Sequence, residues 1–239
     1  MTNDTRRRAP QALVAMMVGG VVLGLLAGGA GAAKKTSNTK VAKAGVLVLT
    51  DFPTGFAASK PDSSSDAMVA TAAKGIPECR DYAAVKKLTD AQVKAKSQDF
   101  KDASRTVSNE VDVFVSVASA RKTLVLFGND DVVTCLNQLF EKVLTDQFVN
   151  DPSSGVSAVK VDITRQDVDP GGDQSVVYEG SYTITAKDGD TQIGIGFAAI
   201  RTGRAVNAVT YQTSSEPLTD LLQPLIDATL GRIDAALSK

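Results

Sequence analysis

The spacing of hydrophobic and polar residues changes several times along the chain, and each change predicts an element. Alternation with a period of two, typical of half-buried β-strands, occurs in six runs: 93–100, 106–117, 156–165, 174–186, 191–201 and 205–213. The first two runs should pair as antiparallel strands. Short turns containing Gly join the last four, which should therefore form an antiparallel meander. A further short apolar strand is expected over 46–49.

Segments with the spacing of an amphipathic helix lie between these strands and after them. Apolar residues three and four apart predict a helix over 117–127 that stops at Gly128. Asp130 or Asp131 should cap the next helix, which has the best apolar stripe of the chain: Val132, Leu136, Leu139, Phe140, Val143 and Leu144. Other helices are expected over 66–74, 78–88 and 216–237. The predicted fold class is α+β, an antiparallel sheet with helices packed on it as an α/β sandwich.

An N-terminal segment precedes this body. Three arginines, Arg6 to Arg8, are followed by residues 11–33, which carry no charge. Such a segment is an export signal peptide or a membrane anchor helix. Small residues at its end fit signal-peptidase cleavage between Ala32 and Ala33, but the segment is also long enough to span a bilayer, so cleavage and retention both remain open. If it is retained, it attaches the protein to the membrane.

Three regions follow from this pattern. Residues 1–33 are expected to be the signal peptide or membrane anchor. Residues 34–45 are polar, basic and free of aromatic residues, and are expected to form a flexible linker. Residues 46–239 should form a single exported α+β domain, either extracellular or held at the outer face of the cell membrane.

The composition removes whole classes of chemistry. The 239 residues include no His, which excludes Ser-His-Asp and Cys-His catalysis and His-ligated zinc. The 26 basic and 27 acidic residues give a net charge of -1, so no nucleic-acid partner is expected. Cys79 and Cys135 are the only cysteines. In an exported chain an even number of cysteines favours a disulfide, and their wide separation does not suit a redox-active pair.

Four short patterns resemble functional motifs but lie in the wrong context. The G-x-G-x-x-A match at 194–199 lies inside strand alternation, without the helix that a nucleotide site needs, and its glycines should instead leave one strand face bare. The acidic turn at Asp167, Asp169 and Asp173 misses the EF-hand spacing. Ser119 and Lys122 match S-x-x-K, but the partner motifs of that hydrolase class are missing. No pair of acidic residues stands in the apolar or aromatic setting that would indicate paired carboxylates for glycoside hydrolysis. No catalytic, cofactor or metal residue is therefore expected.

Several of these features together resemble a known family. They are the export segment with its polar spacer, residues 49–56 (LTDFPTGF), one Cys on an early helix, Cys135 on a central helix, and a strand meander before the last helix. The order is similar to the extracytoplasmic sensor domain of mycobacterial receptor-type Ser/Thr kinases and its secreted and lipoprotein relatives, which are actinobacterial. The resemblance implies an α/β sandwich with a cleft for a ligand. This chain has no kinase domain, and no family catalytic residue exists to carry over.

The functional expectation follows from these points. The sequence favours a non-enzymatic exported protein of the cell envelope that binds a small ligand or an envelope partner, without indicating which residues bind. An interaction module without a ligand pocket is the second possibility. A His-independent envelope hydrolase is the third, and it would need Lys122 within hydrogen-bond reach of Ser119 or two carboxylates facing each other across a cleft.

Overall fold

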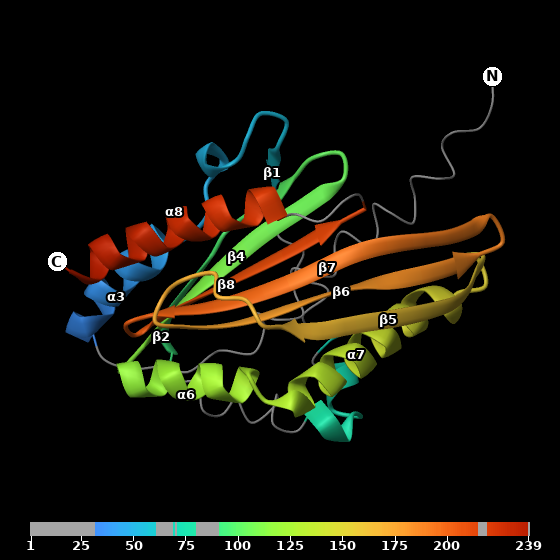
Figure 1. The fold of residues 1–239 in the computed structure, drawn as a ribbon, viewed down its shortest axis with the longest axis horizontal. Coiled ribbons are helices and arrows are strands. Elements are labelled where there is room, and N and C mark those ends of the chain that lie inside the picture. Colours follow the sequence, from blue (N-terminus) through green and yellow to red (C-terminus); the bar gives the residue numbers. More distant parts are fainter. Residues whose placement is uncertain (1–31, 61–68, 70, 80–90, 215–218, 239) are drawn as a thin grey trace.

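An antiparallel sheet of eight strands forms the centre of the molecule. The computed structural model describes residues 32–60, 69, 71–79, 91–214 and 219–238. The strand order is β1-β3-β4-β8-β7-β6-β5, with β2 also paired to β4 (Figure 1). The strands are β1 (Ala57–Ser59), β2 (Ala91–Lys96), β3 (Asp99–Lys101), β4 (Arg105–Phe114), β5 (Val156–Gln166), β6 (Gln174–Ala186), β7 (Gly189–Thr202) and β8 (Ala205–Thr213). The predicted α+β class and the predicted meander are confirmed.

Helices cover both faces of the sheet. Helices α6 (Val117–Phe127) and α7 (Asp130–Leu144) lie on one face, and α3 (Ala32–Ala44) and α8 (Thr219–Leu237) lie on the other (Figure 1). Alternation along each strand supplies an apolar row to both layers, so Tyr178 and Phe197 face α6 and α7, whereas Val177 and Ala198 pack with α8. The helical stripe predicted for α7 is buried along its whole length.

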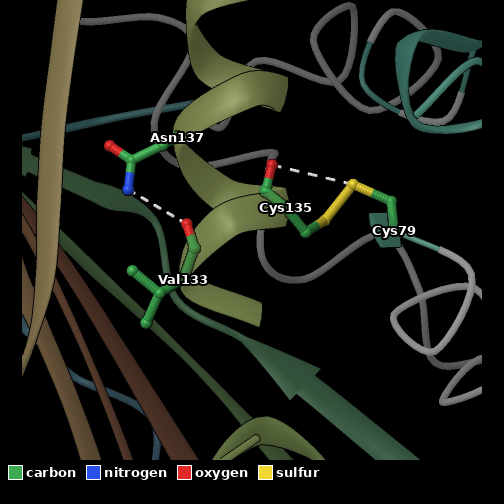
Figure 2. Close-up of a disulfide and its surroundings, with 4 residues drawn as sticks. All are labelled: Cys79, Val133, Cys135 and Asn137. Atoms are coloured by element: carbon green, nitrogen blue, oxygen red, sulfur yellow. Dashed lines mark hydrogen bonds between the residues drawn. A yellow bond between two sulfur atoms is a disulfide. The ribbon is translucent and has the colours of Figure 1, made fainter. Parts of the chain in front are cut away.

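A disulfide joins Cys79 to Cys135, as the sequence predicted. It ties the short 3-10 helix η2 (Pro77–Cys79) to the middle of α7, and neither cysteine is exposed to solvent. Figure 2 shows the bond on one side of α7 and Asn137 on the other. Asn137 hydrogen-bonds the main chain of the edge strand β5 twice, since its Oδ1 accepts from Ile163 N–H and its Nδ2 donates to Ile163 O, both at 2.8 Å. The Asn137 side chain thereby occupies backbone groups of the edge strand with which another strand could otherwise pair.

Three local predictions were wrong or imprecise. Residues 46–49 form no strand, because Leu47 N–H donates to a buried Asn109 side chain and the chain then turns into the 3-10 helix η1 (Leu49–Asp51). The cap of α7 is Asn129 and not Asp130 or Asp131. Strand β4 ends at Phe114, before the predicted limit of 117, because Ser116 caps α6.

The expected linker also differs from the structure. Residues 34–45 fall mostly within α3, which packs on β2, β4 and α8 and buries Val41 and Ala42. Val41 and Ala42 pack on an apolar surface of the sheet at Val111 and Val113, and the buried Asn38 accepts a hydrogen bond from Arg204.

Some predictions fall on residues that are not described. The signal or anchor segment 1–33 lies outside the described residues except for Ala32 and Ala33, the first residues of α3, so cleavage stays a prediction. Of the helix expected over 66–74, residues 69 and 71–73 are helical, whereas most of the helix expected over 78–88 lies outside the described residues. Within the described ranges, no helix combines the length and the apolar character needed to cross a bilayer.

Candidate ligand-binding groove

Among the described residues, the last helix covers only part of its sheet face. Helix α8 packs through Leu225, Ile226 and Leu230, and the strands β5, β6 and β7 extend past its N-terminal end (Figure 1). On this uncovered stretch lies a groove with a volume of about 520 Å³. Its lining comes from four adjacent strands and the residue after the last: Thr164, Gln166, Glu179, Gly180, Ser181, Gln192, Gly194, Ile195, Tyr211, Thr213 and Ser214.

Two glycines on β7 shape the floor of the groove. Gly194 and Gly196 point the same way along the strand, and no side chain stands on that face between Gln192 and Ala198. The Tyr211 ring lies directly over Gly196, where an added Cβ would come within 2.1 Å of a ring carbon. The G-x-G-x-x-A match therefore lies inside a strand, as its alternation predicted, and its glycines let an aromatic ring and the groove approach the backbone.

Tyr211 and Glu179 form the central polar contact of the groove. The Tyr211 hydroxyl donates to Glu179 Oε1 at 2.5 Å. Burial raises the pKa of Tyr211, and the hydrogen bond to Glu179 and the negative charge of that carboxylate raise it further. The phenol consequently stays protonated at neutral pH and remains a hydrogen-bond donor to the carboxylate.

Two glutamines line the walls and are held by neighbouring hydroxyls. Gln192 Nε2 donates to Ser181 Oγ at 2.9 Å, and Gln166 Nε2 donates to Thr164 Oγ1 at 2.8 Å. Each amide thus gives one of its two N–H groups to a neighbour, and it keeps the other N–H and the carbonyl oxygen. Glu179 is the one charged residue in the lining as described. The groove is therefore polar and mildly negative.

The other residues singled out in the sequence serve the fold. Asp173 Oδ2 accepts from Arg201 Nη1 at 2.9 Å and from Gly203 N–H at 2.7 Å, which ties the acidic turn to the β7–β8 turn. Asp169 Oδ1 accepts from Gly171 N–H within its own turn. No cluster of three or more potential metal ligands occurs in the described part of the chain.

The possible Ser-Lys pair is not formed. Ser119 lies in the first turn of α6, and its hydroxyl bonds the hydroxyl of the cap residue Ser116 at 3.0 Å. Lys122 is exposed on the next turn of the helix. The two carboxylates that the alternative hydrolase mechanism needs do not face each other in the groove either, because its described lining holds Glu179 alone.

Sequence reasoning identified none of the groove residues as a site. The available signal was weak: polar residues at one parity on neighbouring strands, combined with two glycines on a third. Outward polar residues of this kind are typical of any solvent-facing sheet. The groove lies where the described part of α8 stops short of the outer strands.

A second cluster of charges is buried near the opposite edge of the sheet. Lys94 on β2 contacts two acidic residues of β4, Glu110 Oε1 at 3.1 Å and Asp112 Oδ1 at 3.8 Å. Asp112 is 2% exposed. Burial raises its pKa well above the usual value, with Lys94 opposing this shift and Glu110 adding to it.

This cluster predicts a pH-dependent effect of Asp112→Asn. Because the native pKa is raised, the folded state holds the proton more tightly than the unfolded chain, so stability falls as pH rises from the ordinary Asp value toward the native one. The amide of the variant would not ionise, and we expect the variant to gain about 1 kcal/mol or more at neutral pH. Urea unfolding between pH 4 and 8 measures it. The gain should shrink toward pH 4, and Asp188→Asn on an exposed turn should show no such trend. A pH-independent difference would contradict the assignment.

The geometry defines the class of the molecule as an α+β domain with a polar groove on one face of its antiparallel sheet. No protein family and no curated protein matches the chain. Among solved structures, it is similar to the extracellular domain of PknH from Mycobacterium tuberculosis, at 11% identity and a TM-score of 0.39, over 67% of this chain and 76% of that one. It is also similar to CyanoP, the cyanobacterial PsbP from Synechocystis sp. PCC 6803, at 14% identity and a TM-score of 0.35, over 77% and 86%. These values do not assign the chain to a family.

Proposed function

We propose that this is an exported, non-enzymatic protein of the cell envelope that binds a small polar ligand in the groove between α8 and the outer strands. The groove itself is the observation on which the proposal rests. Its volume of about 520 Å³ falls within the range usual for small-molecule sites, roughly 300 to 1,000 Å³. Its walls supply the convergent polar groups that orient a ligand, from Glu179, Tyr211, Gln166 and Gln192.

The disulfide supports the exported location. Cys79 and Cys135 are bonded and fully buried, and such structural disulfides persist in oxidising compartments and are rare in the cytosol. This agrees with the basic and apolar N-terminal segment, whose type is that of an export signal or anchor. The proposed location is extracellular or at the outer face of the membrane.

The proposal is tested by filling the groove. Ser181 lies in its wall, and Ser181→Tyr should occupy the space that a ligand needs. Native mass spectrometry of protein purified from its own host should show a co-purifying mass on the original chain and none on this variant. Thr185→Tyr adds the same ring on the same strand face, beyond the groove, and should keep the ligand. A clean apo mass for the original chain under gentle conditions would contradict the proposal.

A further inference from the structure

The groove presents acceptors and one negative charge, and this selects a class of ligand. Within the described part of the chain, Tyr211 is the one side chain that donates to the Glu179 carboxylate, and it contacts Oε1 alone. No Lys or Arg stands in the described lining to neutralise this charge. A carboxylate with one oxygen held in place by a buried donor forms a strong, directional acceptor for a positively charged group.

The walls are neutral and add acceptors. Gln166 and Gln192 each give one amide N–H to Thr164 and Ser181, and the carbonyl oxygens of both glutamines are acceptors near Glu179. An anionic ligand would meet a like charge here, with a cost in free energy and no basic partner in the described lining. A ligand rich in donors meets a complementary surface.

We propose that the groove binds a small organic cation, with a primary ammonium group seated on Glu179 and its further N–H donors directed at the glutamine carbonyl oxygens. This inference rests on the proposed function and names the ligand class for the same site. Glu179 lies opposite Gly196, whose face is filled by the Tyr211 ring, so the ammonium group would approach the carboxylate from the groove, on the side of Gly194. Tyr211 acts as a positioning residue, because its ring packs on Gly196 and its hydroxyl orients the carboxylate.

The probe is 1,5-diaminopentane, with 1,5-pentanediol and glutarate as neutral and anionic compounds of matched length. In a titration followed by amide chemical shifts, the diamine should give saturable changes at groove residues on β6, β7 and β8, and the diol and the dicarboxylate should not. Raising the ionic strength should weaken binding of the diamine, because the contact is between charges.

Glu179→Gln keeps an acceptor for the Tyr211 hydroxyl but removes the charge, and it should weaken binding of the diamine at least about tenfold. Asp190→Asn removes the same charge from the same face of the sheet, six residues along β7 from the partner of Glu179, and should leave the affinity unchanged. Unchanged thermal unfolding of both variants shows that each still folds. Tyr211→Phe keeps the ring on Gly196 and should weaken binding several-fold by releasing the carboxylate.

Three results would overturn the inference: no saturable shift with the diamine, tighter binding of glutarate or the diol than of the diamine, or equal affinity of Glu179→Gln and the original chain. Each is distinguishable from failure of the proposed function. If Ser181→Tyr still abolishes a ligand that co-purifies from the host, the groove is a binding site and only the ligand class proposed here is wrong.

Discussion

Removing the disulfide should lower the free energy of unfolding by about 4 kcal/mol. Cys79 and Cys135 are 56 residues apart, and closing a loop of this length restricts the unfolded chain by that amount on the chain-entropy model. We expect Cys79→Ala with Cys135→Ala to show this loss in urea unfolding at neutral pH. Cys79 on η2 and Cys135 on α7 are both buried in the same hydrophobic core, and Ala keeps these sites apolar.

Reduction provides the control for the disulfide. A reductant should move the unfolding midpoint of the original chain toward that of the double variant, and it should leave the variant unchanged. Intact mass before and after reduction should differ by two hydrogens. Two free thiols in the purified protein, or equal stability of the original chain and the double variant, would contradict the structural role.

The second large effect is expected at Asn109. This residue on β4 is fully buried on the face that carries α3 and α8. Its Oδ1 accepts from Leu47 N–H, and its Nδ2 donates to Gly45 O and to Asn207 Oδ1, each at 2.8 Å. Asn207 Nδ2 in turn donates to Thr229 Oγ1 of α8 at 2.7 Å, so Asn109, Asn207 and Thr229 form a row of hydrogen-bonded side chains. One amide therefore joins the chain after α3, the centre of the sheet and the last helix.

Replacing Asn109 with Leu should destabilise the protein by roughly 3 to 9 kcal/mol. The change leaves three buried polar groups without their partner, and each costs about 1 to 3 kcal/mol. Urea unfolding measures the loss. Thr229→Val, which removes the acceptor of Asn207 Nδ2 and the hydroxyl's own bond to Ile226 O, should cost about 1 to 2 kcal/mol. A loss for Asn109→Leu no larger than that for Thr229→Val would show that the segment around Gly45 and Leu47 is held by other contacts.

The two binding experiments do not depend on these stability effects. Ser181, Glu179 and Asp190 lie on or beside the open sheet face, away from the disulfide and from the Asn109 row. Variants at these sites therefore report on the groove, provided that their unfolding transitions match that of the original chain.

Most elements of the sheet could be predicted because their pattern is local. Strands β5 to β8 alternate with period two and are joined by turns with glycines at positive φ, such as Gly189 and Gly203. Helix α7 shows a complete apolar stripe, and two cysteines in an exported chain predict one bond. Each of these signals depends on residues close together in the sequence, or on a simple count.

The roles of Asn109 and α3 could not be predicted from local sequence patterns. Asn109 interrupts a row of valines at the same parity on β4, and its partners at 45, 47 and 207 are distant in the sequence. Residues 34–45 look like a solvated spacer because they are mostly polar, whereas the surface on which Val41 and Ala42 pack, and the arginines that bond Asn38 and Ala44, lie far away in the sequence.

By itself, the sequence determined the fold class, the four-strand meander, the stripe of α7 and the pairing of the cysteines, since period, turn residues and cysteine count encode them directly. The tertiary structure alone decided that α3 packs on the sheet, that Asn109 joins three distant segments, and that α8 stops short of the outer strands. That last difference in length creates the groove, and it arises from the way separate elements are placed against one another.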